Sequence, residues 1–244
     1  MALHLDGKLW GPWIAENYPK EIKSLRDALL TKMLPSLPDA EEEATAHQQA
    51  MWEWAMSRPS DGNDDGSWWA EWAQEQGFEL YERLTRVRQA VLNMGTVMLW
   101  HLLEQQMLCF HRRRVLSIHE ENDALNDPKV HKKLYRIEEF EERLAAGGLC
   151  LDQVAAWSKV KELRLVANAV KHGPGVSALK LHAIRPELFT APGLSEDTFF
   201  NAPNALRIGR PAGGEDIYVT DKDLEEYFDA TLEFWNEFAA RNQQ

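Results

Sequence analysis

The stretch LDQVAAWSKVKELRLVANAVKHG, from Leu151 to Gly173, decides how this chain folds. At about 100° per residue, its apolar and polar side chains separate onto opposite sides of a helix. The apolar side must be buried against other helices, and it consists of Val160, Leu163, Val166, Ala167 and Val170. On the polar side, Arg164, Asn168 and His172 are spaced four residues apart, so their side chains form one column.

The end of this helix is marked by its sequence. Gly173 follows His172 directly, and Pro174 and Gly175 come next, so the helix must stop there. Lys171 and His172 occupy the last turn, where the carbonyl end of a helix favours cations. His172 therefore has two interpretations: a residue that caps the helix, or a member of a functional site.

Helical periodicity continues outside this stretch. It predicts helices over residues 19–34, 39–57, 75–116, 132–146, 151–173 and 223–242. Asp39 is expected to cap the second of these helices, and Thr220 or Asp221 the last. Residues 120–130 are polar and residues 176–214 are interrupted by Pro and Gly, so both are predicted to be connections. Ile217-Tyr218-Val219 is typical of a short strand.

These elements predict an all-α fold, a bundle of long antiparallel helices with an irregular C-terminal insertion before a last helix. The chain has 244 residues, of which 44% are hydrophobic, and can bury a substantial core. We expect a single helical domain over residues 1–244. Its parts would be N-terminal helices with a Trp-rich hairpin (1–74), core helices (75–173), an irregular connection (174–220) and a C-terminal helix (221–244).

Three features favour a cytoplasmic protein that does not enter a membrane. Cys109 and Cys150 show no CxxC or CxxH spacing, which indicates buried, reduced thiols. The N-terminus lacks the basic and apolar regions of a signal peptide. The most apolar segment, residues 91–110, is interrupted by polar side chains and therefore favours a core helix over a membrane span.

The distribution of charge leaves two interpretations open. The net charge is −12, yet basic residues crowd the middle of the chain: Arg83, Arg86, Arg88, Arg112, Arg113, Arg114, Lys129, Lys132, Lys133 and Arg136. A local basic surface can bind a polyanion even on an acidic protein. In that case RNA would contact Arg112, Arg113, Arg114 and Lys161. The alternative is that these charges solvate helix faces or pair with acidic segments.

Tryptophans flank the Pro- and Gly-rich loop at residues 57–67, and they are Trp52, Trp54, Trp68, Trp69 and Trp72. So many indoles cannot all be buried in one short hairpin. We therefore expect some of them to cover a neighbouring element or a partner. A platform for stacking nucleic-acid bases is the alternative, although the surrounding acidic residues would repel phosphate.

Catalytic motifs are few. The chain contains no P-loop, no GxGxxG after a strand, no GxSxG and no HExxH, and its histidines lack the spacing of metal ligands. We therefore expect neither a metal site nor a cofactor. His101 and Glu104 share a face in an apolar run and need partners, because buried polar groups must be hydrogen-bonded. Arg164 is the partner that we predict for them.

The segment ELRLVANAVKHG, Glu162 to Gly173, resembles the signature helix of the HEPN superfamily. Members of that superfamily are all-α domains that usually dimerise, and many are metal-independent ribonucleases in toxin–antitoxin and antiviral defence systems. Their motif is an Arg, commonly followed by Asn, with a His a few residues further on. Asn168 and His172 match the Asn and the His. Ala167 stands where the family has its Arg, and Arg164 lies one turn earlier.

The resemblance implies a ribonuclease in which the ribose 2′-OH attacks the phosphate. His172 would act as acid or base, and Arg164 would hold the phosphate. Asn168 would orient the imidazole of His172 or a phosphate oxygen. Glu104 or His101 would fix Arg164, and Lys171 would support the site. RNA, a second copy of the chain and an antitoxin or defence-complex protein are the expected partners. Two alternatives remain: a catalytically degenerate scaffold, and a helical module that binds another protein through the Trp-rich hairpin.

Overall fold

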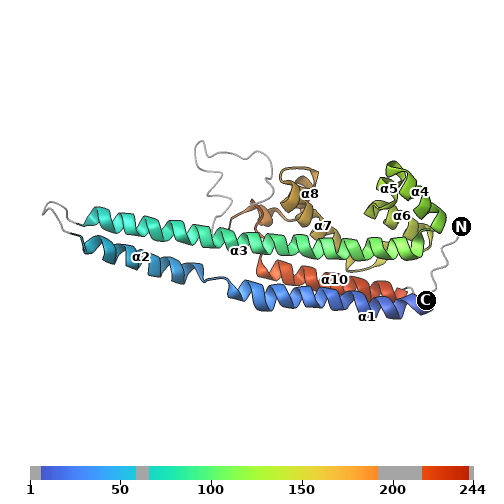
Figure 1. The fold of residues 1–244 in the computed structure, drawn as a ribbon, viewed down its shortest axis with the longest axis horizontal. Coiled ribbons are helices and arrows are strands. Elements are labelled where there is room, and N and C mark those ends of the chain that lie inside the picture. Colours follow the sequence, from blue (N-terminus) through green and yellow to red (C-terminus); the bar gives the residue numbers. More distant parts are fainter. Residues whose placement is uncertain (1–6, 59–65, 192–215, 242–244) are drawn as a thin grey trace. The chain divides into compact units, whose positions relative to one another are not determined.

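Figure 1 shows the chain as a computed structural model, which describes residues 7–58, 66–191 and 216–241. Within these ranges the secondary structure is helical and no strand occurs, so the predicted all-α fold is confirmed. By internal contacts the chain falls into two compact units, a smaller one over Ala28–Val91 and a larger one made of Met1–Asp27 and Leu92–Gln244. The single domain expected from the sequence stays a prediction, and each unit buries its own set of apolar side chains.

Nine long or short α-helices lie in the described ranges. They are α1 (Gly7–Arg26), α2 (Ala40–Met56), α3 (Ser67–Phe110), α4 (Ile118–Asn126), α5 (Pro128–Leu134), α6 (Ile137–Ala146), α7 (Trp157–His172), α8 (Val176–Ile184) and α10 (Asp221–Arg241). Short π-helical or 3₁₀ segments join or extend them: η1 (Asp27–Met33), η2 (Leu34–Ser36), η3 (His111–Val115), η4 (Leu151–Gln153) and η5 (Pro186–Phe189). The helix predicted to begin at Pro19 begins at Gly7 and runs through Pro19.

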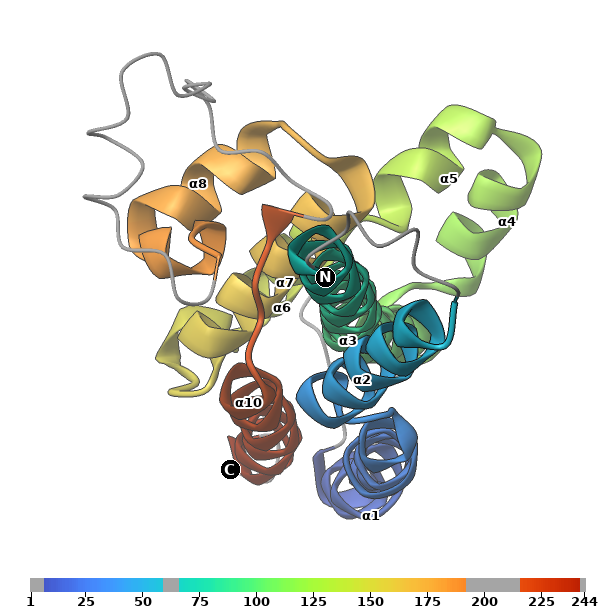
Figure 2. The same cartoon turned by 90° about the vertical axis from the view of Figure 1, so that its left-hand side faces the viewer.

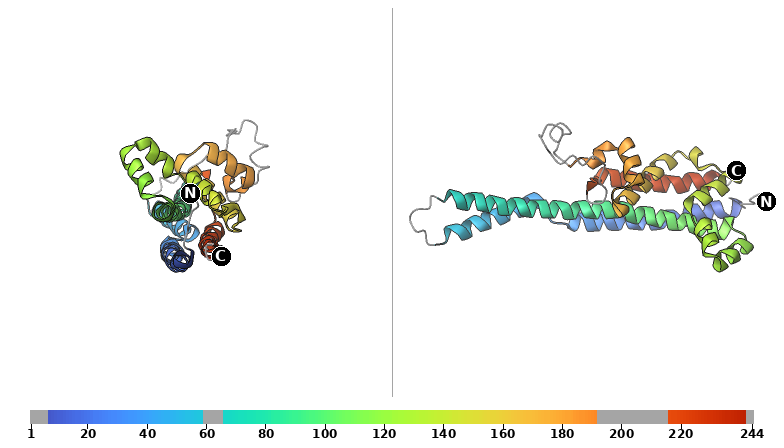
Figure 3. Two further views of the ribbon diagram at one scale, coloured as in Figure 1. Left: turned by 90° about the vertical axis from the view of Figure 1, so that its right-hand side faces the viewer. Right: turned by 90° about the horizontal axis from the view of Figure 1, so that it is seen from above.

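In the larger unit, α1 and α10 lie side by side (Figure 2). Arg26 Nη1 lies 2.7 Å from Asp229 Oδ1 near one end of the pair. Further along, the rings of Tyr18 and Trp235 are 4.6 Å apart between centroids. The order of these contacts, descending on α1 and ascending on α10, fixes the antiparallel direction. Figure 3 shows the same pair from two further directions.

A buried glutamine ties the second half of α3 to both of these helices. Trp235 Nε1 donates a hydrogen bond to Gln106 Oε1 at 2.7 Å. Gln106 Nε2 donates to Glu21 Oε2 at 2.9 Å and to the Tyr18 carbonyl at 3.2 Å. Because the amide uses its acceptor and both its donors, burying it leaves no polar atom unpaired. This side chain therefore fixes the register of the three helices as well as filling the core.

In the smaller unit, α2 and the first part of α3 approach closely at one glycine. A Cβ atom on Gly77 would lie 2.9 Å from Gln48 Cβ and 3.1 Å from the Ala44 carbonyl oxygen. Gly77 is therefore needed for space and not for an unusual backbone angle.

Asp39 caps α2 as predicted, because its carboxylate accepts from the backbone N–H groups of Glu41 and Glu42 at 2.9 and 3.0 Å.

Replacing Gly77 by alanine should destabilise the smaller unit. Alanine in a helix normally gains about 0.5–1 kcal/mol over glycine, but here the new Cβ meets Gln48 and Ala44 at contact distances that force the helices apart. We expect a net loss of about 1 kcal/mol, measured by urea unfolding followed by circular dichroism. Gln74→Ala, on the exposed side of the same helix, is the control. A stabilised Gly77→Ala variant would contradict the close packing.

Two segments that the sequence predicts to be connections are helical. Residues 120–130 form parts of α4 and α5, since Ser117 and Glu120 make a capping box and Asp127 caps α5 with Pro128 in its first turn. Residues 176–184 form α8, and Pro186–Phe189 form η5. Residues 192–214 of that predicted connection lie outside the described residues, as does most of the loop at 57–67. The capping box that begins at Ser117 and the Asp127-Pro128 pair are patterns that can be recognised in the sequence.

The predicted strand at Ile217-Tyr218-Val219 is also wrong. This segment is extended, but it pairs with no strand among the described residues. The Tyr218 N–H donates to the carbonyl of Leu188 in η5 at 2.8 Å, and Asn93 Nδ2 donates to the Ile217 carbonyl at 2.7 Å. Thr220 then caps α10 as expected, since its hydroxyl accepts from the Asp223 N–H at 3.1 Å.

Candidate functional site

The predicted column of Arg164, Asn168 and His172 lies on α7, a single helix that belongs to the larger unit. The helix begins at Trp157, six residues later than predicted, because Leu151–Gln153 forms a 3₁₀ turn. Its apolar side is buried as predicted at Val160, Leu163, Val166 and Ala167, whereas Val170 is only half-buried. With a rise of about 1.5 Å per residue, the backbones of Arg164 and His172 lie about 12 Å apart along the axis.

Arg164 is held by α6. Its guanidinium forms a hydrogen-bonded ion pair with Glu138 and lies 3.8 Å from the Glu141 carboxylate. It also lies over the ring of Trp100, 5.7 Å from the centroid. The prediction that Glu104 or His101 fixes this arginine is wrong, because the carboxylates that do so come from a helix whose packing the sequence did not reveal.

These contacts change the ionisation of both carboxyls. Burial opposes ionisation of Glu138, yet the hydrogen bond from Arg164 holds the pKa of Glu138 below its ordinary value. Burial raises the pKa of Glu141, and the charge of Arg164 acts in the opposite direction. Arg164 therefore compensates two acidic groups of α6, and moving it to a substrate would remove that compensation.

The other members of the column stand apart from this ion pair. His172 and Lys171 are exposed and Asn168 is half-buried. Neither the side chain of Asn168 nor that of His172 makes a hydrogen bond with another residue that the structure describes. Gly173 ends the helix with φ +64°, and its N–H donates to the Ala169 carbonyl at 3.0 Å. The glycine, and not the histidine side chain, thus closes the helix.

The predicted RNA-binding residues do not form one surface element. Arg112, Arg113 and Arg114 belong to η3, whereas Lys161 belongs to α7. Arg112 Nε lies 3.0 Å from Glu121 Oε1, and Lys161 Nζ lies 2.8 Å from Asp152 Oδ1. Two of the four cations therefore pair with nearby carboxylates. Of the predicted supporting residues, His101 and Lys171 are exposed and Glu104 is half-buried.

An ionic cluster that the sequence analysis missed joins α7, η5 and α10. The Arg185 guanidinium binds three carboxylates, those of Glu162, Glu187 and Asp223, and its contact with Asp223 Oδ1 is 2.6 Å. The side chains of Arg185, Glu162 and Asp223 are only 18%, 14% and 10% exposed. The Tyr227 hydroxyl donates to Glu162 Oε1 at 2.8 Å. Each of the three guanidinium nitrogens of Arg185 meets a carboxylate, so the cluster acts as a clamp between helices.

The contacts within this clamp shift the pKa values of Asp223 and Tyr227. Burial opposes the charged form of Asp223, but hydrogen bonds from Thr220 and Arg185 lower the pKa of its carboxyl. Burial and the neighbouring Glu162 carboxylate raise the pKa of the Tyr227 hydroxyl. Arg185 and Asp223 are far apart in sequence, and only the Thr220-x-x-Asp223 capping pattern could have pointed to one of them.

His111 is the most unusual titratable group of the larger unit. It is fully buried in η3, and neither ring nitrogen has a hydrogen-bond partner among the described residues. Its ring lies 5.4 Å from that of Phe140. Burial, aided by the charge of Arg143, lowers the pKa of His111 to about 4. The His111 side chain is therefore uncharged at neutral pH and packs in the apolar core. It is not accessible to a substrate as an acid or base.

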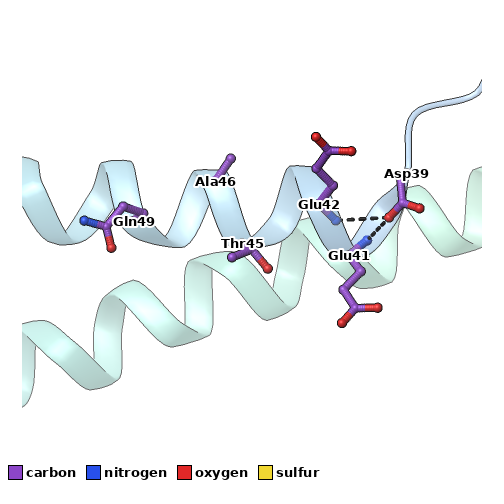
Figure 4. Close-up of a pocket in the computed structure, with 6 residues that line it drawn as sticks. All are labelled: Asp39, Glu41, Glu42, Thr45, Ala46 and Gln49. Atoms are coloured by element: carbon purple, nitrogen blue, oxygen red, sulfur yellow. Dashed lines mark hydrogen bonds between the residues drawn. The ribbon is translucent and has the colours of Figure 1, made fainter.

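The smaller unit has a surface depression along α2, lined by Asp39, Glu41, Glu42, Thr45, Ala46 and Gln49. Figure 4 shows that these side chains come from one helix and its cap, with the Asp39 carboxylate turned to the backbone of Glu41 and Glu42. Its polar groups thus serve the start of the helix. The depression brings together no combination of nucleophile, base and cation.

Among the residues that the structure describes, no group of three His, Cys, Asp or Glu side chains could hold a metal ion. None of the described helices is long and apolar enough to cross a membrane. No protein-family model matches the chain, and comparisons with curated proteins and with solved structures give no significant match. Only the fold class, an all-α protein, is therefore defined, and the function must be argued from the chain's own residues.

Proposed function

We propose that this protein is a non-catalytic helical module that binds another protein, either as a degenerate HEPN-like scaffold or as an unrelated interaction module. The observation that carries the proposal is a set of exposed aromatic side chains in the smaller unit, beside tryptophans whose rings contact one another. Trp54, Trp68 and Phe78 are 43%, 56% and 60% exposed. Large aromatic side chains gathered at a surface are typical of protein interfaces.

The geometry of α7 supports the absence of catalysis. Metal-free cleavage of RNA needs a cation at the phosphate and a proton-transfer group within hydrogen-bond reach of the same atoms. Arg164 already neutralises Glu138 and Glu141 on α6. His172 is exposed two turns further along the helix. Within one chain these residues offer separate polar groups and no shared cleft.

A test with RNA separates this proposal from the ribonuclease predicted by the resemblance. The purified protein and its His172→Ala variant are incubated in EDTA with a mixed-sequence RNA, and products are resolved on a denaturing gel. We expect no cleavage by either protein above a buffer control. Cleavage by the wild type that is lost in His172→Ala would overturn the non-catalytic assignment and restore the ribonuclease.

We also propose a cytoplasmic location, as the sequence predicts, and a homodimer, as the HEPN resemblance implies. The described cysteines, Cys109 and Cys150, are both free thiols, which favours a reducing compartment in this proposal. Sedimentation equilibrium over a range of concentrations measures the oligomeric state. A mass of one chain at every concentration would contradict the dimer and leave the interaction module in place.

A further inference from the structure

We propose that the first turns of α3 dock an arginine-rich segment of a partner protein. This inference rests on the proposed function and names the chemistry of the partner. The surface in question is the acid–aromatic face, which consists of Trp68, Glu71, Trp72, Glu75, Phe78 and Glu79. It lies entirely within the smaller unit.

The helical geometry places these six side chains together. At about 100° per residue they fall within a sector of roughly 120° around the axis of α3. Trp68, Phe78 and the three glutamates are exposed, and Trp72 is half-buried. Carboxylates and aromatic rings therefore alternate along one open face over three turns, while Ala73 and Gly77 on the other side pack in the unit.

The carboxylates of this face have no partner in the part of the chain that the structure describes. The carboxylates of Glu71, Glu75 and Glu79 form no hydrogen bond or ion pair with any other residue that the structure describes. Glu82, one turn further on, is different, since its carboxylate pairs with Arg86 at 3.0 Å. Three like charges at successive i, i+4 positions repel one another, so a cation brought between them is favoured.

A tryptophan in contact with this face already binds one guanidinium group within the chain. Arg58 Cζ lies 3.7 Å from the centroid of the Trp54 ring. Trp54 in turn contacts Trp72 of the acid–aromatic face, at 5.6 Å between centroids. A guanidinium stacks on an indole face more favourably than an ammonium does, because it is planar and weakly hydrated. The intramolecular contact therefore shows which side chain suits this cluster.

Charge selects the class of partner. An arginine-rich segment would place guanidinium groups on the open rings and between the unpaired glutamates, so that one side chain satisfies both features. A polyanion such as RNA, or an anionic membrane, would be repelled by the same carboxylates. A wholly apolar partner would have to bury Glu71, Glu75 and Glu79 without compensation, which is costly.

The experiment measures binding of three synthetic peptides to the full chain by isothermal titration calorimetry. Each peptide is helical and alanine-based, and it carries arginine, glutamate or serine at every fourth position. We expect binding of the arginine peptide alone, weakened by added salt because the glutamates are exposed.

Variants then locate the site. Glu71→Gln/Glu75→Gln/Glu79→Gln should weaken binding by about tenfold, and Trp68→Ala by a similar factor. The control, Glu41→Gln/Glu42→Gln/Glu43→Gln, removes the same charge from α2 of the same unit and should change affinity less than about twofold. Circular dichroism of each variant verifies that the helices remain.

The outcomes separate this inference from the proposed function. Equal loss in the two glutamine triples would overturn the acid–aromatic face as the site. Binding of the glutamate or serine peptide that Trp68→Ala abolishes would overturn the cationic partner and leave the interaction module standing. If none of the three peptides binds the folded wild type, the proposal of an arginine-rich partner is overturned. If the wild type also cleaves RNA in EDTA, the proposed non-catalytic function fails as well.

Discussion

Replacing Arg185 by methionine should lower the free energy of unfolding by about 3–5 kcal/mol. The guanidinium holds Glu162, Glu187 and Asp223, of which Glu162 and Asp223 are largely buried. Without it, Glu162 would keep only Lys159 and Tyr227 as partners. Asp223 would keep only Thr220, and both carboxylates would lie in a poorly solvated position between α7 and α10 without their shared cation. Urea unfolding followed by circular dichroism measures the loss, with the midpoint and the slope fitted separately.

The control for this experiment is another arginine in an ion pair. Arg86 pairs with Glu82 at 3.0 Å, but its side chain is 74% exposed. Arg86→Met should therefore change stability by no more than about 0.5 kcal/mol. Arg185→Lys keeps the charge but loses the fork that reaches several carboxylates, and it should fall between the two. A cost below about 1 kcal/mol for Arg185→Met would mean that the clamp is not a principal source of stability.

Acid should destabilise the protein through His111. Its pKa in the folded state is about 4, against an ordinary value of 6.5. The unfolded chain therefore binds more protons between these values, and the stability that the neutral ring provides is present above pH 6.5 and lost as the pH falls towards 4. The difference corresponds to roughly 3 kcal/mol. Urea unfolding at several pH values between 7 and 4 measures it.

His111→Phe separates this effect from the titration of carboxyl groups. The variant fills the buried position with a ring that cannot be protonated, so its stability should fall less than that of the wild type over the same pH range. His172→Phe, at an exposed position, removes one imidazole without entering the core and should follow the wild type. Parallel curves for His111→Phe and wild type would show that the buried ring does not couple to pH.

The sequence predicted most of the helices because their apolar stripes report burial on one side. α2, α7, α10 and the long α3 appear where periodicity and caps placed them, with ends shifted by several residues in α3 and α7. Residues 120–130 were misjudged because α4 and α5 are short, and composition outweighed the caps at Ser117 and Asp127. Short helices depend on their termini more than on a hydrophobic stripe.

The candidate site was less accessible from the sequence. Helical spacing correctly placed Arg164, Asn168 and His172 on one helix. It could not show which neighbouring helix would supply the partner of Arg164, since α6 and α7 meet through tertiary packing. The clamp around Arg185 was missed for the same reason. Contacts between residues far apart in the chain depend on packing angles that no local pattern encodes.

The clamp also constrains how this protein can vary through evolution. Removing one member of a buried ion cluster is costly, whereas replacing all of its members by apolar residues of similar volume is often neutral. Substitutions at Glu162, Arg185 and Asp223 should therefore be inherited together, and an aligned set of relatives should display these three columns as covarying. A lineage that has lost the arginine would be expected to carry hydrophobic residues in place of both acids.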